Sequence, residues 1–242
     1  MKIIVSEEIA SVCPGFVGAC VDAEVENTSF SQPLWDEIHE MEERFRSELT
    51  TESLKEQSGI AATRRVYKAC GKDPSRYRPA SEALIRRMLQ GKELYQINTL
   101  VDLINLASIA YGYSIGGFDA GKFVGDTLTL GIGREGEPYE GIGRGMINIH
   151  GLPVYRDAEG GVGTPTSDHE RTKITMDTRH LVYLSTAMTA RQNVWRPMPV
   201  SYRSCYAGMP IAMAAVISFI NNANVLSVPA RISIAGDRKD DE

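Results

Sequence analysis

The sequence is poor in cysteine and has no excess of basic residues, and each of these shortages argues against particular classes of protein. Its 242 residues include four cysteines, dispersed without a C-x-x-C pair or a histidine at ligand spacing: Cys13, Cys20, Cys70 and Cys205. This pattern predicts neither a disulfide framework nor a zinc site, so we expect no metal and no cofactor. The formal net charge of −5 argues against a protein that coats nucleic acid indiscriminately.

Long apolar runs are also missing. The longest one, residues 209–220, is too short to cross a bilayer, and acidic residues stand near the N-terminus, where a signal peptide needs its apolar centre. We therefore expect a cytoplasmic protein without a membrane partner. The composition, 43% hydrophobic and 24% charged, provides the material for a packed core. We expect one domain over residues 1–235 and a disordered tail over 236–242.

Hydrophobic spacing predicts a mixture of helices and strands. The predicted strands cover residues 2–5, 16–25, 126–130, 146–150, 152–155 and 228–234. The predicted helices cover residues 34–49, 51–70 with an interruption at Ser58-Gly59, 80–90, 99–111 and 209–222. A repeated Gly-Ile-Gly-Arg on either side of residues 134–140 predicts a β-hairpin that has this segment as its turn.

The segment from Ile97 to Gly133 has the clearest pattern. Thr99 followed by Asp102 forms a predicted capping box, apolar residues recur at helical spacing, and Gly112 ends the predicted helix. A polar stripe runs along this helix, because three polar residues lie at i, i+4 and i+7: Asn98, Asp102 and Asn105. A glycine turn and a strand follow, so this segment can form the wall of a pocket.

A basic run precedes that segment. Between Arg64 and Lys92 the chain has nine basic residues and only two acidic ones, Asp73 and Glu82. Two interpretations remain open at this point. The run is either a solvated helix face or a patch that contacts phosphates.

Residues 167–184 combine a dense polar stretch with a predicted apolar strand. His169 lies between two acidic residues, Asp168 and Glu170. A histidine in this setting is either an oriented general base or part of a surface turn whose charges pair with one another. No serine or cysteine nucleophile stands in a recognisable setting nearby, so no catalytic triad is predicted.

Four motifs occur in a fixed order along residues 76–184: R-x-x-S-E-A-L-x-R-R, I-N-x-L-V-D-x-x-N, G-x-F-D and E-R-T-K-I-T-x-D-T. In these motifs the sequence closely resembles the free-standing relatives of the B3/B4 domain of the phenylalanyl-tRNA synthetase beta subunit. In the synthetase this domain is an editing module, which hydrolyses the ester of tyrosine wrongly attached to the tRNA for phenylalanine. The resemblance implies an α+β fold with mixed sheets and packed helices, and a pocket for the aminoacyl-adenosine end of tRNA.

The resemblance also implies site residues. Asn105 resembles the asparagine of the editing helix, and the turn at residues 116–119 resembles a turn whose first position in the synthetase is a pocket histidine. Gly116 stands at that position here. The candidate catalytic residues are Asn105, His169 and Glu170, with Asp168 as another candidate for the base.

The remaining candidates bind substrate. Asn105 and Asp102 are expected to orient water. Thr172 or Thr175 is expected to donate a hydrogen bond to the oxyanion or to the adenosine hydroxyls. The candidate substrate-binding residues are Asp102, Gly116, Gly117, Thr172, Thr175 and Asp177. The candidate tRNA-binding residues are Arg76, Arg78, Arg86 and Arg87.

Three functions remain open. The first is a tRNA-binding hydrolase that deacylates a mischarged aminoacyl-tRNA in trans, with the aminoacylated 3′ end as its partner and no DNA. The second is a non-catalytic tRNA- or RNA-binding module that retains the fold, which the absence of a histidine at Gly116 favours. The third is an amino-acid-binding protein that uses the same pocket without nucleic acid.

Overall fold

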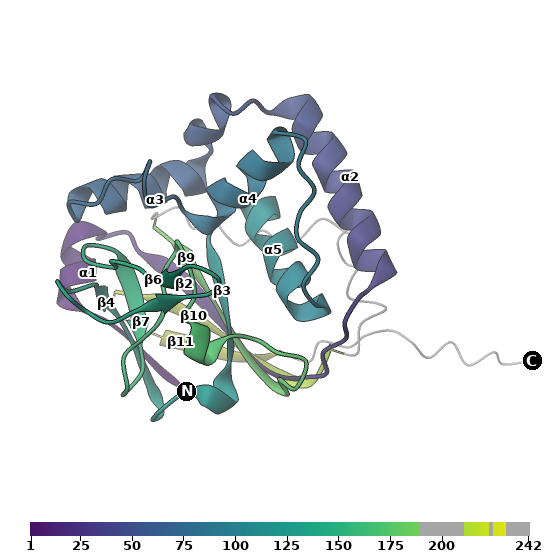
Figure 1. The fold of residues 1–242 in the computed structure, drawn as a ribbon. Helices are drawn as coiled ribbons and strands as arrows, with labels where there is room; N and C mark the ends of the chain where they lie inside the picture. Colours follow the sequence, from purple (N-terminus) through teal and green to yellow (C-terminus); the bar gives the residue numbers. More distant parts are fainter. Residues whose placement is uncertain (189–210, 223–224, 231–242) are drawn as a thin grey trace, which may run out of the picture.

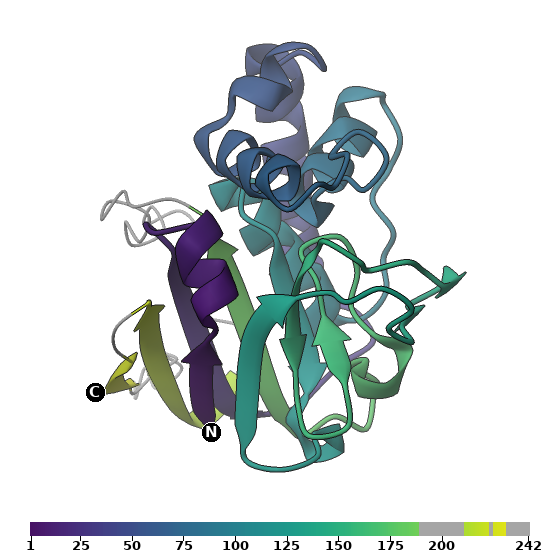
Figure 2. The same ribbon diagram turned by 90° about the vertical axis from the view of Figure 1, so that its left-hand side faces the viewer.

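The computed structural model describes residues 1–188, 211–222 and 225–230. Most of its helices gather on one side of two β-sheets, as the two perpendicular views in Figure 1 and Figure 2 show. The helices are α1 (Glu7–Val12), α2 (Gln32–Glu48), α3 (Ser58–Ala69), α4 (Ala80–Leu89) and α5 (Thr99–Tyr111), with short 3-10 turns η1 (Ser53–Glu56), η2 (Ala120–Lys122) and η3 (Glu170–Thr172).

One sheet has five antiparallel strands and the other has four strands. The five-stranded sheet has the order β11 (Val225–Ala230), β10 (Ile211–Asn221), β2 (Val17–Val25), β9 (His180–Ala187), β3 (Ile115–Asp119). The four-stranded sheet has the order β1 (Lys2–Val5), β4 (Thr127–Ile132), β7 (Pro153–Arg156), β8 (Gly161–Gly163), and only its β1–β4 pair is parallel. A small hairpin joins β5 (Glu140–Gly141) to β6 (Gly145–Met146). The predicted α+β class is confirmed.

Two apolar cores hold these layers together. Side chains from both sheets share one core, in which Phe118 of β3, Leu130 of β4 and Val182 of β9 are almost fully buried. A second core joins α2, α4 and α5, where Leu34 and Ile85 are almost fully buried. The strand β3 is the edge strand of the five-stranded sheet, and it contacts α5 of the helical layer. Its Phe118 belongs to the core that is shared with the second sheet.

Local signals explain several boundaries. The helix α5 ends at Gly112, which adopts a φ of 67°, and Gly91 has a φ of 71° just after α4. Both values lie in the left-handed region that glycine adopts without strain. Gly59 was expected to interrupt the second helix, but α3 begins at Ser58 and continues through it. A Cβ at Gly59 would lie 2.5 Å from the carbonyl oxygen of Gly112, so this glycine allows close approach of the backbones.

The predicted helix over residues 209–222 is wrong. Residues 211–221 form β10, which pairs with β2 on one side and with β11 on the other. An uninterrupted apolar run carries no clear period, so it fits a buried strand as well as a buried helix, and pairing with two neighbouring strands decided between them. The strand predicted over 228–234 corresponds to β11, which begins earlier, and residues 231–242 lie outside the described part.

The predicted hairpin around residues 134–140 is also wrong. The strand β4 pairs with β7 instead, and the only hairpin turn in this part of the described chain lies at residues 141–145, where Gly143 and Gly145 each have a φ of 66°. The carboxylate of Glu137 accepts hydrogen bonds from the Arg134 amide at 2.8 Å and from Arg156 Nε at 2.6 Å. These bonds fasten the segment to β7, so its two ends do not pair.

No helix within residues 1–188, 211–222 or 225–230 is long and apolar enough to cross a membrane. The boundary of one domain over residues 1–235 stays a prediction.

Candidate functional site

The polar stripe of α5 divides into two parts. Asn98 caps the helix by accepting the Val101 amide at 3.1 Å, so the cap is one residue earlier than the predicted Thr99. Asp102, only 1% exposed, accepts the Ile97 amide at 3.0 Å and Trp35 Nε1 of α2 at 2.9 Å. Burial raises the pKa of this carboxyl, although the donors oppose the shift. Asp102 therefore fastens α5 to α2, and its oxygens already have partners.

Asn105, three residues after Asp102, has different neighbours. Val101, four residues earlier, packs beside the core that contains Ile174, and the Ser108 hydroxyl, three residues later, accepts the Ile115 amide of β3 at 3.3 Å. Residues at this spacing share one helix face, so Asn105 lies on the face turned toward β3. Its side chain is half-buried and forms no hydrogen bond to the rest of the described chain. Asn105 is therefore available to a ligand.

Three glycines surround one carboxyl group, and we call them the glycine cradle: Gly116, Gly117 and Gly163. A Cβ at Gly116 would lie 2.8 Å from Asp168 Oδ1, and a Cβ at Gly163 would lie 3.0 Å from the same atom. The amide of Gly117 donates to Asp168 Oδ2 at 3.2 Å. The absence of side chains at Gly116 and Gly163 therefore makes the space that the Asp168 carboxyl occupies, and Gly117 binds it through its amide.

This carboxyl has unusual electrostatics. Burial raises the pKa of Asp168 to about 7, and the hydrogen bond from Gly117 offsets only part of that shift. No ion pair to Asp168 occurs in the described ranges. A carboxyl with a pKa near neutrality can both accept and return a proton near pH 7, which suits a general base.

His169 follows directly and turns toward another partner. Its Nδ1 accepts the Arg171 amide at 3.0 Å, so the proton of the neutral ring is on Nε2. Burial and the Arg171 charge lower the pKa of the imidazole. The ring lies edge-on to Tyr139, with centroids 4.9 Å apart. His169 is therefore a neutral hydrogen-bond donor through Nε2 rather than a strong base.

Two predicted residues of the next segment have structural partners. Glu170 forms an ion pair with Lys173 on the same turn. The hydroxyl of Thr172 is fully buried and donates to the carbonyl of Val162 at 3.4 Å. Neither group is free to act on a ligand in this arrangement.

The two further predicted residues lie in a turn. The Thr175 hydroxyl accepts the Asp177 amide at 3.3 Å, and the Thr175 carbonyl accepts Asn27 Nδ2 at 2.9 Å. The side chain of Asp177 is exposed. The structure therefore brings Gly116 and Gly117 against the carboxyl of Asp168, whereas the hydroxyls of Thr172 and Thr175 have partners elsewhere.

Part of the basic run has internal partners. Glu82, fully buried, accepts Arg64 Nη1 at 2.9 Å and 3.1 Å, and Arg86 approaches it at 3.8 Å. Arg87 donates from Nε to the Glu93 carbonyl at 2.6 Å. These cations therefore hold the helical layer together.

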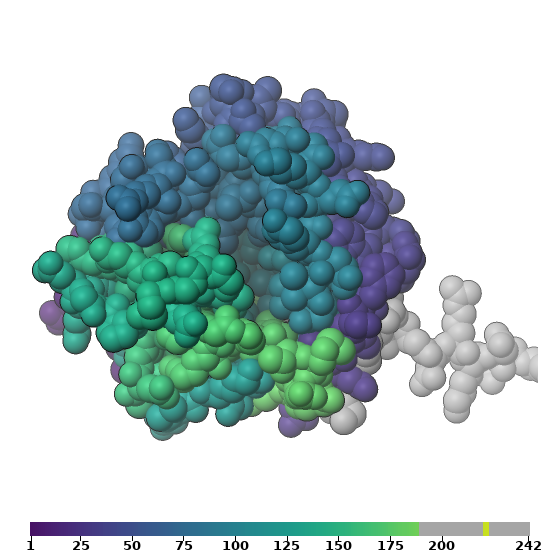
Figure 3. Space-filling view, viewed as in Figure 1, coloured from purple at the N-terminus to yellow at the C-terminus, as the bar shows by residue number. Residues whose placement is uncertain are grey.

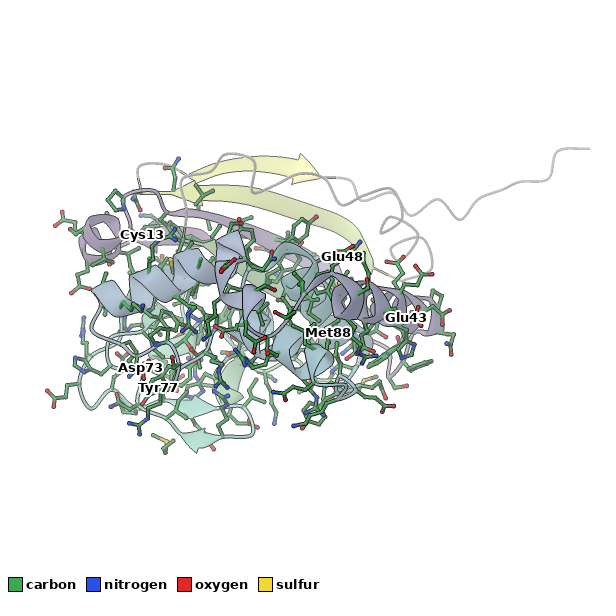
Figure 4. All side chains as sticks on the ribbon, turned by 90° about the horizontal axis from the view of Figure 1, so that it is seen from above. Cys13, Glu43, Glu48, Asp73, Tyr77 and Met88 are labelled. Carbon is green, nitrogen blue, oxygen red and sulfur yellow. The ribbon has the colours of Figure 1, made fainter. Side chains whose placement is uncertain are left out.

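Arg76 and Arg78 differ, because both are exposed and neither forms an ion pair in the described part. Figure 4 places Asp73 and Tyr77, which lie on either side of Arg76 in the sequence, at the opposite end of the molecule from Glu43 and Glu48 of α2. The end that carries Arg76 is thus separated from the acidic surface of α2.

One face of the molecule is hollowed. Figure 3 shows a depression between the segment 134–150, the bright green segment near 170–180 and the blue-teal segment near 80–98. The hairpin of β5 and β6 reaches the cradle, because the Ile142 amide donates to the Asp168 carbonyl at 3.0 Å. The helical layer reaches it as well, through the Ala80 amide and the Pro165 carbonyl at 2.7 Å.

No group of three or more metal-ligating side chains exists within the described ranges. The candidate site therefore consists of a partly exposed, weakly acidic carboxyl in the glycine cradle, the neutral histidine that follows it, and the free side-chain amide of Asn105. Such a set suits a polar organic ligand whose reaction moves one proton.

A comparison with known protein families assigns the fold. The B3/4 domain matches residues 62–196, more than half of the chain, so the chain belongs to the B3/4 domain family. The structure is similar to that of an N-terminal fragment of the phenylalanyl-tRNA synthetase beta-subunit from Pyrococcus horikoshii, with a TM-score of 0.48 and 12% identity. The alignment covers 95% of this chain and 54% of that chain, so the protein spans about half of the fragment's length. No curated protein matches the sequence.

Sequence reasoning did not find the cradle as a unit. The glycine turn pointed to Gly116 and Gly117, and the polar stretch pointed to the neighbourhood of Asp168. The sequence around Gly163 does not indicate that this glycine belongs to a site. The contact that requires a glycine there comes from side chains distant in the sequence, such as Phe118.

Proposed function

We propose that this protein is a tRNA-binding hydrolase that deacylates a mischarged aminoacyl-tRNA in trans, in the cytoplasm. The observation that carries the proposal is the Asp168 carboxyl, which has a pKa of about 7 and lies against the glycine cradle. An aminoacyl ester is already activated, so one positioned base and a few donors suffice for its hydrolysis.

The reaction needs one proton relay. Asp168, as a carboxylate, takes a proton from a water molecule while the water oxygen attacks the ester carbonyl carbon. When the tetrahedral intermediate collapses, the bond between that carbon and the ribose oxygen breaks. The protonated Asp168 then returns its proton to the ribose oxygen, so the products are a free amino acid and an uncharged tRNA.

Two further groups support the reaction. His169 presents its Nε2 proton, which can stabilise negative charge on the ester oxygen. The free amide of Asn105, on the α5 face turned toward β3, would orient the water or the amino acid. Arg76 and Arg78 are the candidate phosphate contacts for this reaction, since Arg86 lies 3.8 Å from the buried Glu82 and Arg87 already uses its Nε within the helical layer.

The test is release of amino acid from a panel of mischarged tRNAs. Asp168→Asn preserves the size of the side chain and removes the base, so kcat should fall by roughly 10²–10⁴-fold. Asp126→Asn, an exposed carboxyl at the start of β4, is the matched control and should act as wild type. The wild-type rate should rise with pH and level off above about pH 7, which is the pKa of Asp168. Absence of release with every tRNA, or equal rates for both variants, overturns the proposal.

A second candidate, an amino-acid-binding protein, is favoured by the same carboxyl. Asp168 has no cationic partner in the described chain, so it could receive the α-ammonium group of a free amino acid. Thermal stabilisation by free amino acids without any deacylation would support this function. Stabilisation that Asp168→Asn leaves intact would contradict it.

A further inference from the structure

Hydrogen bonds hold three separate surface segments together beside α5. The Asn27 side chain donates to the Thr175 carbonyl at 2.9 Å and accepts the Leu100 amide at 3.3 Å. The Thr99 amide donates to the Thr28 carbonyl at 2.9 Å. Segments 27–30, 96–100 and 175–176 therefore form one surface whose backbone is fixed before any ligand binds.

This surface exposes large apolar side chains, and we call them the apolar shelf: Phe30, Tyr95, Ile97 and Met176. Their exposed fractions are 46%, 66%, 55% and 45%. Single exposed apolar residues are ordinary, but four on segments joined by hydrogen bonds mark a binding surface. Gln96, between two of them, donates to the Ser29 carbonyl at 2.6 Å, which holds Tyr95 and Ile97 beside Phe30.

A cation lies on the shelf. The Arg87 guanidinium stacks over the Tyr95 ring, 3.9 Å from its centroid, and its Nε is fixed by the Glu93 carbonyl. Lys92 lies nearby, because its amide donates to the Arg87 carbonyl at 3.2 Å. Its side chain is exposed to solvent. An exposed aromatic ring with an ordered guanidinium on one face offers its other face for stacking and a positive charge for a phosphate.

The segments that carry the shelf also support the candidate site. The Ile97 amide is bound by Asp102 at the start of α5, and Ile104 of the same helix lies where a Cβ of Gly117 would be. Ile174, next to Thr175, lies close to the same position. The segments of the shelf are therefore packed against the cradle.

We propose that the apolar shelf binds the unpaired nucleobases at the single-stranded end of an RNA. Tyr95 and Phe30 stack on bases, Ile97 and Met176 cover their faces, and Arg87 with Lys92 contacts the phosphates. Base stacking on aromatic side chains is independent of sequence and requires unpaired bases, so a duplex cannot use the shelf. The identity of this RNA as a tRNA rests on the proposed function, whereas the stacking does not.

The test is binding of a short, uncharged, fluorescently labelled single-stranded RNA, measured by anisotropy against the same sequence as a blunt duplex. Tyr95→Ala should weaken binding of the single strand by roughly 5- to 150-fold, and Tyr95→Phe should retain it. Val124→Ala, another exposed apolar residue, is the matched control. Because Tyr95 is largely exposed, the variants should keep the wild-type melting temperature.

Three outcomes overturn the inference. One is equal binding by Tyr95→Ala and wild type, and another is an equal loss for single strand and duplex. The third is a self-association in analytical ultracentrifugation that Tyr95→Ala abolishes while RNA binding is unchanged, since the shelf would then be an interface between two copies. Asp168→Asn separates the two proposals, because it should lose hydrolysis and keep the Tyr95-dependent RNA binding.

Discussion

The helical layer and the glycine cradle differ in how many hydrogen-bond donors and cations surround their carboxyl groups. In the helical layer Glu82 has two hydrogen bonds from Arg64, and Asp102 has donors from Trp35 and Ile97. In the cradle Asp168 has one backbone donor and no cation among the described residues. A carboxyl that is fully paired fixes structure, and one that is underpaired keeps a proton affinity that chemistry can use.

The difference also separates two kinds of charge in the basic run. Arg64 and Arg86 compensate a carboxylate inside the protein, so they are unavailable to phosphates. Arg76 and Arg78 have no such commitment in the described chain and face solvent. The basic run therefore contains two kinds of arginine, those that pair with a buried carboxylate and those that face solvent, and composition alone does not distinguish them.

The largest effect should come from breaking the pair in the helical layer. Arg64→Met leaves Glu82 buried with only Arg86, 3.8 Å away, and should lower the free energy of unfolding by about 3–5 kcal/mol. Urea denaturation measures this. Arg65→Met, an exposed neighbour on α3, should change stability by less than about 0.5 kcal/mol. Similar losses in both variants would contradict the role assigned to the pair.

A smaller effect is expected from filling the cradle. The Cβ of Gly116→Ala would lie 2.7 Å from Phe118 Cζ and 2.8 Å from Asp168 Oδ1, so the carboxyl must move. The variant should lose about 1–3 kcal/mol of stability and most of its deacylation rate. Gly160→Ala, where a Cβ meets nothing within 4 Å, is the control for both measurements. Unchanged activity in Gly116→Ala would separate the cradle from the reaction.

The smallest effect concerns the Asp168 charge itself. Its pKa is raised on folding, so the folded protein binds this proton more tightly, and stability falls as pH rises from about 4 to about 7. Asp168→Asn avoids that loss and should be more stable than wild type by about 1 kcal/mol at about pH 8, with no difference at about pH 4; the figure is reduced because the carboxyl is partly exposed. Thermal melting at both pH values checks this. Glu82→Gln, which removes a paired charge, should be less stable than wild type at about pH 8. A gain in stability in this variant would contradict the difference drawn between the Glu82 and Asp168 carboxyls.

Local rules predicted the elements whose cause is local. The helix over 99–111 followed from apolar spacing and from Gly112, and the buried face of α2 followed from Leu34, Ile38 and Met41 at helical spacing. The failures have non-local causes. The strand β10 is set by its two neighbours, and the segment 134–140 is set by the bonds of Glu137 to Arg156.

The candidate site divides in the same way. Asn105 and the glycine turn could be predicted from one stretch of sequence. Asp168 was only one of several polar neighbours, and its separation from Glu170 and Thr172 depends on contacts with Gly117, Lys173 and Val162. Spacing along the chain cannot show which of these groups lacks a partner.

The loop that leads to Asp168 is anchored from a distance. Pro165 is bound by the first amide of α4 at 2.7 Å, and the hydroxyl of Thr166 lies 2.9 Å from that of Tyr67 on α3. A small displacement of either helix would shift the carboxyl relative to Gly117 and change its proton affinity. Substitutions in the helical layer can therefore change the proton affinity of Asp168 without altering the glycines that surround it, so this carboxyl can be tuned from a distance.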